Sequence, residues 1–177
     1  YSSLKPGGLI VLPISYLMMA VGFFAGTHVS SLPPSLRSIW LVFHVLFAKL
    51  GAGGMLISLA AAVLYLLKEK KADGAMPNLP SLKVLDSYSH RFAAFGFVFW
   101  TIMLAAGAIW ADQSWGRYWG WDPIETWALI TWLLFGIYLH LRRFARFSGR
   151  RAALLLTVCF ACSVFTIMIL PIAARTL

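Results

Sequence analysis

Residues 39–67 read IWLVFHVLFAKLGAGGMLISLAAAVLYLL, an apolar run in which Lys49 is the only charged side chain. An α-helix needs roughly 20 predominantly apolar residues to cross a lipid bilayer. This run is longer than that requirement, so it predicts a membrane span that tilts or extends beyond the hydrocarbon core.

Apolar runs of similar character lie on both sides of this stretch. Hydrophobic residues make up 60% of the 177 residues and charged residues 12%, with a mean hydropathy of +0.79. Soluble domains are about half apolar and one-quarter charged, so this composition excludes an ordinary soluble fold. We expect an all-α integral membrane protein with one membrane domain over residues 1–177. Its predicted spans are about 8–25, 39–67, 92–110, 124–140 and 152–173, with a short surface helix over 81–89 and a non-helical loop over 112–123.

The formal net charge is +9, and the lysine and arginine residues cluster at the ends of the apolar runs. They are not interleaved with aromatic residues on a polar segment, so nucleic acid is not an expected partner. Basic residues gather in cytoplasmic loops, which places segments 68–91 and 142–151 in the cytoplasm. The sequence therefore predicts a multi-pass protein of the cell inner (plasma) membrane, with a cytoplasmic N-terminus and an external loop at 112–123.

This external loop contains the most informative stretch, WGRYWGWDPIETW over residues 115–127, with Trp110 before it and Trp132 after it. Such a density of indole rings exceeds what an interfacial aromatic belt requires. In a short loop with glycine and proline breaks, the rings can form a flat hydrophobic platform beside the outer leaflet. A large planar ligand would fit that surface.

Two carboxylates, Asp122 and Glu125, flank Pro123 at the start of the fourth predicted span. A proline at the first helical position follows a capping residue well, and acidic groups favour the positive end of the helix dipole. Helix capping is therefore the favoured interpretation of both residues, and a contribution of Asp122 to ligand binding stays open beside it.

The ordered tryptophan stretch resembles the "WWD" signature of the heme-handling proteins of cytochrome c biogenesis. The similarity is closest to the CcsA/ResC branch of the System II cytochrome c synthetase and more distant for CcmC and CcmF. It extends from about residue 33 to residue 140 and includes Trp40 with His44 and Leu85-Asp86 with Ser89. The first and fifth spans match only in kind.

The resemblance implies that the external loop holds heme, b-type and bound or in transit, and presents its vinyl groups to the Cys-x-x-Cys-His of an apocytochrome. The expected cofactor-binding side chains are His44, Trp115, Trp119, Trp121, Asp122 and Trp127. In the family two external histidines ligate the heme iron, and His44 matches the first. A neutral imidazole near the outer end of a span suits that role, although an interhelical hydrogen bond is the alternative.

The second external histidine of the family should follow a Leu-Pro pair near the end of the fifth span. Here Leu170-Pro171 is followed by Ile172, and no histidine occurs after His140. Three interpretations stay open: the ligand lies beyond Leu177, another residue such as His28 replaces it, or bis-histidine heme handling has been lost. Activity as a cytochrome c heme lyase or synthetase component is therefore an open expectation.

Further candidates surround this site. His140 matches an inner histidine of the family and is an expected second metal ligand on the cytoplasmic side, or else a membrane-interface residue. Lys49 is an intramembrane charge that should face the bundle or extend its ammonium outward. Lys49, Arg37 and Arg117 are candidates to neutralise the heme propionates.

The leading hypothesis is a CcsA-like heme-handling protein of cytochrome c assembly. Its expected partners are a CcsB-like or other membrane subunit, a c-type cytochrome or apocytochrome, and the lipid bilayer. The alternative is a non-catalytic anchor of a respiratory or electron-transfer complex that docks a cytochrome or a quinone through the tryptophan loop.

Overall fold

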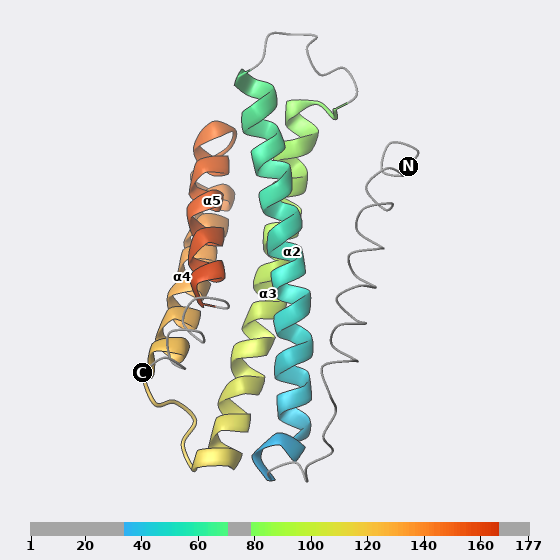
Figure 1. Cartoon of the computed structure of the whole chain (residues 1–177). Coiled ribbons are helices and arrows are strands. Elements are labelled where there is room, and N and C mark those ends of the chain that lie inside the picture. Colours follow the sequence, from blue (N-terminus) through green and yellow to red (C-terminus); the bar gives the residue numbers. More distant parts are fainter. Residues whose placement is uncertain (1–33, 71–78, 167–177) are drawn as a thin grey trace. The chain divides into compact units, whose positions relative to one another are not determined.

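The structure is a computed structural model that describes residues 34–70 and 79–166 (Figure 1). These residues form a short 3-10 helix and four α-helices, and no strand occurs among them. The helices are η2 (Pro34–Arg37), α2 (Ile39–Lys70), α3 (Leu82–Trp115), α4 (Pro123–Phe144) and α5 (Arg150–Val164). The predicted all-α class is confirmed.

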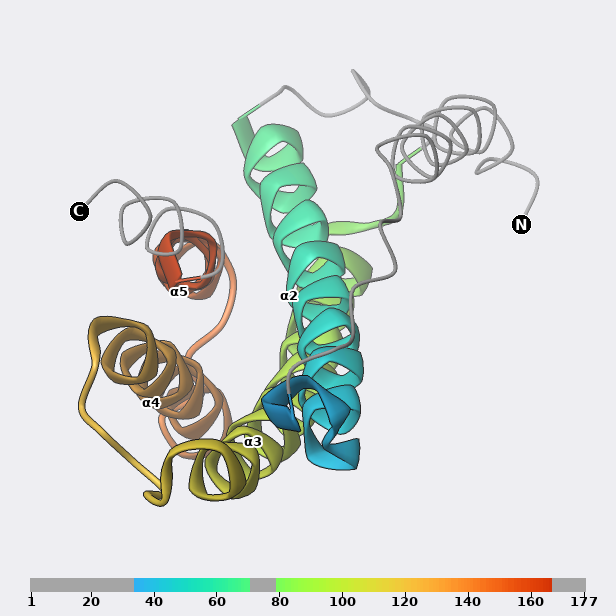
Figure 2. The same cartoon turned by 60° about the horizontal axis from the view of Figure 1, so that its bottom comes forward.

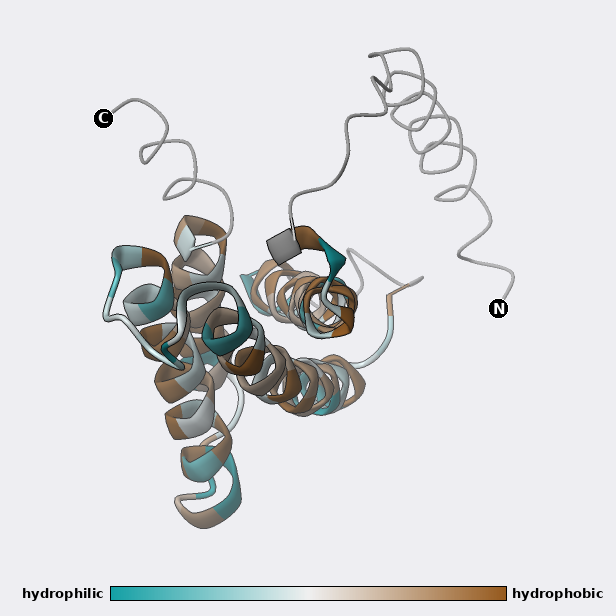
Figure 3. Ribbon diagram, turned by 90° about the horizontal axis from the view of Figure 1, so that it is seen from below, coloured by the Kyte–Doolittle hydropathy of each residue, from teal (hydrophilic) through white to brown (hydrophobic). Residues whose placement is uncertain are grey.

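Three of the described helices, α2, α3 and α4, are long and apolar enough to cross a membrane. Hydrophobic residues make up much of the described helices (Figure 3), and many large apolar side chains, among them Leu46, Val98 and Leu133, are exposed. Such outer surfaces suit lipid rather than water. The predicted span 8–25 and the end of the predicted span 152–173 lie outside the described residues, so the count of five spans stays a prediction.

Helix α3 differs from the expected boundaries. The predicted surface helix over 81–89 and the predicted span from 92 are one continuous helix, because no glycine or proline interrupts the chain between them. Ser81 caps its start by accepting a hydrogen bond from the Val84 N–H, and Gly116, at φ 70°, ends it. A left-handed glycine is a common helix terminator. The helix therefore includes residues 112–115, and the predicted external loop shortens to 116–122.

The helices form a ring in which α3 contacts α2 and α4, and α5 contacts α4 and α2 (Figure 2). The α2–α3 contact is close because glycines face one another across it. A Cβ atom added to Gly54 would lie 3.0 Å from the Gly96 nitrogen, and one added to Gly96 would lie 3.0 Å from the Gly51 oxygen. Small residues at such crossings let two helix backbones approach within a membrane.

Two tryptophans outside the external loop tie α3 to α4. Trp100, which is fully buried, donates from Nε1 to the Ala128 carbonyl at 3.2 Å. Trp132 donates from Nε1 to the Thr101 hydroxyl at 2.8 Å. Each bond joins the two helices on either side of the loop, so the loop 116–122 begins and ends on a fixed pair of helices.

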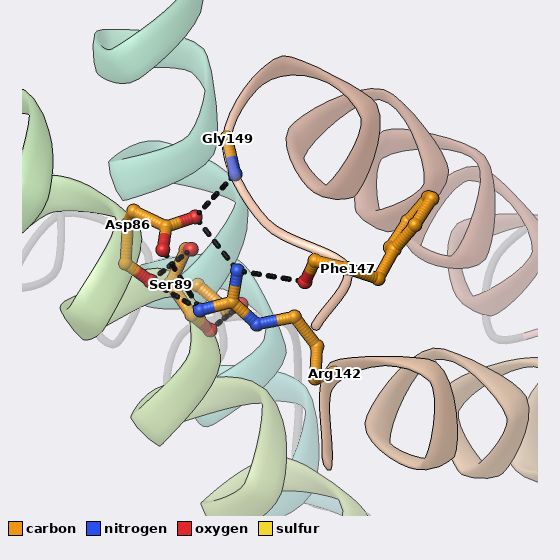
Figure 4. Close-up of polar contacts among 6 residues, drawn as sticks. Asp86, Ser89, Arg142, Phe147 and Gly149 are labelled. Carbon is orange, nitrogen blue, oxygen red and sulfur yellow. Dashed lines mark hydrogen bonds and ion pairs between the residues drawn. The ribbon is translucent and has the colours of Figure 1, made fainter. Parts of the chain in front are cut away.

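A bidentate ion pair joins the other ends of α3 and α4 (Figure 4). Arg142 donates from Nη1 to Asp86 Oδ1 at 2.8 Å and from Nη2 to Oδ2 at 2.9 Å. The same guanidinium donates to the Phe147 carbonyl at 3.2 Å, and Asp86 Oδ1 accepts the Gly149 N–H at 3.1 Å. Two charged groups in the predicted cytoplasmic segments therefore fix the loop between α4 and α5.

Candidate functional site

A pocket of about 250 Å³ lies where α2 begins, α3 ends and α4 begins. Its walls are almost wholly apolar. The volume is slightly below the usual range for ligand sites, so it would take one face or edge of a large planar molecule and not enclose it. The lining residues are His44, Met103, Leu104, Gly107, Ala108, Trp110, Ala111, Trp115, Tyr118, Trp119, Asp122, Ile124, Glu125 and Ala128.

Among residues 34–70 and 79–166, His44 is the only histidine that lines this pocket. It lies one turn into α2 and is half-buried. Its Nδ1 is 2.9 Å from the main-chain oxygen of Met103 on α3. Because a carbonyl oxygen can only accept, Nδ1 carries the proton, and Nε2 keeps its lone pair. An imidazole oriented through one nitrogen in this way is the usual arrangement for ligation of a metal through the other.

Gly107 makes room for this imidazole. A Cβ atom at Gly107 would lie 2.6 Å from His44 Nδ1 and 2.9 Å from its Cε1, closer than any real Cβ contact. Met103 and Gly107 are one helical turn apart on α3, so the carbonyl that orients the ring and the gap that receives it lie on the same face. The α3 backbone therefore sets the position of the His44 ring.

Aromatic rings continue from the imidazole to the loop. His44 stacks on Trp110, with ring centroids 6.3 Å apart and an interplanar angle of 23°. Trp110 meets Trp115 edge-on at 4.8 Å, and the Arg117 guanidinium lies 6.0 Å from the Trp115 ring centroid. The His44 imidazole, which could ligate a metal, therefore lies beside the rings of Trp110 and Trp115, and the exposed Arg117 cation lies beyond them.

The loop is held by the two carboxylates at the start of α4. Asp122 Oδ1 accepts the Glu125 N–H at 2.8 Å, which confirms that Asp122 caps the helix. Glu125 Oε2 accepts the Gly120 N–H at 2.6 Å and so fixes the loop backbone. Both residues also line the pocket, and they are its only acidic members.

The structure brings four of the predicted site residues together, namely His44, Trp115, Trp119 and Asp122. Trp119 adds a buried indole N–H that has no partner within residues 34–70 and 79–166. This unsatisfied donor could bind an acidic substituent of a ligand, and the lone pair of His44 Nε2 could bind an iron centre.

Other predicted residues lie outside the pocket lining. Trp121, with φ 58°, is 71% exposed and meets Trp119 edge-on at 6.0 Å. Trp127 packs instead against Phe165 at a centroid distance of 4.6 Å. Lys49 is exposed on α2 and forms no ion pair with the rest of the described chain. Their contacts with a cofactor stay predictions.

His140 is remote from His44. It lies near the end of α4, whereas His44 lies near the start of α2, and these helix ends are at opposite ends of the bundle (Figure 1). His140 is exposed, with its ring 4.6 Å from that of Phe144. No group of three His, Cys, Asp or Glu residues that could hold a metal occurs in the described part of the chain. A role for His140 would therefore be at a separate site.

The arrangement defines a class: an all-α membrane protein with a histidine and several tryptophans around a pocket at one end of the bundle. The chain matches the family described as "Cytochrome C assembly protein" over residues 4–176, and it belongs to that family.

Named relatives agree with this assignment. The chain is 37% identical over 158 residues to cytochrome c biogenesis protein CcsA of Chlamydomonas reinhardtii, covering 86% of this chain and 45% of the relative. It is 37% identical to CcsA of Guillardia theta, covering 86% and 59%, and 36% identical to CcsA of Prochlorococcus marinus (strain MIT 9215), covering 85% and 58%. The chain thus spans about half the length of these curated relatives.

Proposed function

We propose that this chain binds heme at the pocket beside the tryptophan loop, where His44 Nε2 would hold the iron. The observation that carries the proposal is the hydrogen bond from His44 Nδ1 to the Met103 carbonyl, because it leaves Nε2 free and holds the ring still. The stacked Trp110 and the pocket-lining Trp115 and Trp119 would bind the porphyrin edge or face.

The heme is cargo for cytochrome c assembly in this proposal. Its vinyl groups react with apocytochrome thiols, and the protein supplies orientation and an apolar surround. Neither Arg117 nor Lys49 lines the pocket, but the Arg117 guanidinium lies 6.0 Å from the ring centroid of the pocket-lining Trp115, so Arg117 is the propionate contact that we favour. Family membership favours this assembly role over a non-catalytic anchor of an electron-transfer complex.

The proposed orientation follows the charge distribution. The basic α4–α5 loop would face the cytoplasm of a plasma-type membrane and the tryptophan loop the outside, where an apocytochrome would approach. A CcsB-like membrane subunit is a proposed partner because the chain belongs to the cytochrome c assembly family and resembles its CcsA branch. The heme is proposed to be b-type, held by coordination and not by thioether bonds.

Heme binding can be tested without depending on cellular loading. Heme-free protein in non-ionic detergent is titrated with hemin, followed by Soret absorbance and a pyridine hemochrome measurement. His44→Ala should weaken binding at least tenfold, while His90→Ala, near the start of α3 and outside the pocket lining, should bind as the unmodified protein does. His44→Gly should recover binding when free imidazole is added. Equal heme affinity of His44→Ala and the unmodified chain would contradict the proposal.

Assembly activity needs a second experiment. The chain is expressed in a bacterial strain that lacks its cytochrome c synthetase, with and without a CcsB-like protein, and covalent heme is detected by peroxidase staining of denatured cytochrome c. Restored staining that depends on His44 supports the assembly role. A protein that binds heme but never restores cytochrome c would refute the assembly role and leave the heme site intact.

A further inference from the structure

A second hollow, of about 330 Å³, lies in the loop between α4 and α5, at the opposite end of the bundle from the tryptophan loop (Figure 1). It is lined by Ala145, Arg146, Phe147, Ser148, Arg150 and Arg151. Half of these side chains carry guanidinium groups, and no acidic residue of the described part of the chain lines the hollow. Its chemistry is therefore opposite to that of the apolar pocket at His44.

The loop that forms this hollow is fixed in shape. Arg142 donates to the Phe147 carbonyl, and Asp86 accepts the Gly149 N–H (Figure 4). Arg146 takes a left-handed backbone conformation with φ 51°, which a residue other than glycine adopts only where its surroundings hold it. The hollow is thus a preformed feature and not a chance gap between freely moving arginines.

The arginines of this loop do not share one role. Arg142 forms an ion pair with Asp86, and the Arg142 side chain is only 8% exposed. Arg150 has a single distant ion pair, 3.9 Å to Glu69. Arg146 and Arg151 are exposed and make no ion pair within the described part of the chain. A topology signal needs only positive charge near the helix ends. A topology signal does not require that several guanidinium groups without an ion pair line the same hollow.

We propose that this hollow is a binding site for the phosphate of an anionic phospholipid. Guanidinium groups bind phosphate oxygens through paired N–H donors, and basic pockets between membrane helices are suited to lipid head groups. A lipid is favoured over a soluble phosphate because the loop connects two apolar helices, and Phe144, one residue before the lining, is 71% exposed. That ring offers an apolar surface to the acyl chains beside the charged site.

The test uses the full chain in non-ionic detergent and native mass spectrometry. Dioleoyl phosphatidylglycerol, dioleoyl phosphatidylcholine and inorganic phosphate are titrated separately. The variant Arg146→Gln/Arg151→Gln should bind phosphatidylglycerol about 10- to 30-fold more weakly than the unmodified chain. The control Lys70→Gln/Lys83→Gln removes the same charge from exposed residues at the same end of the bundle, and its affinity should change less than about twofold.

Equal losses of phosphatidylglycerol affinity in the two double variants would overturn the proposal, because they would indicate a diffuse positive surface. It would also be overturned if phosphatidylcholine bound as tightly as phosphatidylglycerol, or if millimolar inorganic phosphate displaced phosphatidylglycerol. If the glutamine variant does not fold, the variant Arg146→Lys/Arg151→Lys tests the proposal instead, because it keeps the positive charge and removes the planar guanidinium donors. Weakened selectivity for phosphatidylglycerol supports a built phosphate site, and unchanged selectivity refutes it.

Discussion

The Nδ1 atom of His44 donates a 2.9 Å hydrogen bond to the main-chain oxygen of Met103, and so a side chain of α2 is oriented by the backbone of α3. A main-chain acceptor cannot be removed by changing a side chain, so the arrangement depends on how closely the two helices approach. Gly107, one turn after Met103, permits that approach. The geometry of the proposed iron ligand is thus a consequence of helix packing.

We predict that Gly107→Ala lowers heme affinity about tenfold or more while the protein still folds. The added methyl group would lie 2.6 Å from His44 Nδ1, so the ring must move and lose its bond to Met103. Loss of such an orienting contact typically costs 10- to 100-fold in metal affinity. Hemin titration measures the effect. Gly53→Ala is the matched control, because a Cβ there meets nothing within 4 Å. Equal affinity of the two variants would contradict the role of Gly107.

Trp119 and Trp121 are neighbours with different surroundings, and we predict different consequences of replacing them. Trp119 lines the pocket, whereas Trp121 is 71% exposed and does not. Trp119→Leu should weaken heme binding about fivefold, since an aromatic contact contributes about 1 kcal/mol. Trp121→Leu should weaken heme binding less than Trp119→Leu does. If Trp121→Leu is the more damaging substitution in the hemin titration, the pocket is not the heme site.

Much of the helical fold could be predicted from the sequence, for reasons that single residues illustrate. Apolar runs define membrane helices by length, and Asp122-Pro123 marks the start of α4 because capping and proline preferences are local. The sequence predicts a surface helix over 81–89 separate from the next span, because Asp86, His90 and Arg91 look like the polar border of a span, whereas the structure has one helix from Leu82. A charged residue is tolerated within that helix because Asp86 has a partner in Arg142, 56 residues later, and sequence alone does not reveal this pairing.

The candidate site was predictable only in part. His44 and the tryptophans carry recognisable chemistry, so they could be selected before their positions were known. Gly107 has no side-chain chemistry. It contributes by leaving space for the His44 ring, and that space depends on the distance between α2 and α3. Trp121 illustrates the opposite case: its residue type suggested the pocket, but a left-handed backbone angle of 58° accompanies a ring that lies outside the pocket lining. No signal in the sequence singles out Gly107.

The cap at Asp122 permits its structural and ligand-binding roles to be separated. Asp122→Asn retains a side-chain oxygen that can accept the Glu125 N–H, so we predict an almost unchanged thermal midpoint. Asp122→Ala loses that acceptor and should destabilise the protein by about 1 kcal/mol. If capping is the whole role, the asparagine variant binds hemin as the unmodified chain does. A loss of heme affinity at full stability would instead show that the carboxylate charge acts on the ligand.

The pair Asp86–Arg142 should dominate the stability of the opposite end of the bundle. Its side chains are only 20% and 8% exposed, so removal of either partner leaves a largely buried charge without compensation. We predict that Arg142→Gln costs about 3 kcal/mol, as for other buried pairs. Glu69→Gln, which breaks the exposed 3.9 Å pair with Arg150, should cost less than about 1 kcal/mol. Thermal unfolding in detergent compares them.

The variant Asp86→Asn tests whether the charge or the hydrogen-bond network matters at this junction. The amide can accept from Arg142 or Gly149 through one oxygen only, and the uncompensated guanidinium remains. Since the charge is the larger loss, Asp86→Asn should destabilise the protein nearly as much as Arg142→Gln, and the double variant by less than the sum of the two. Strict additivity would mean that the two residues stabilise the helices independently, and that the ion pair does not hold the α4–α5 loop in place.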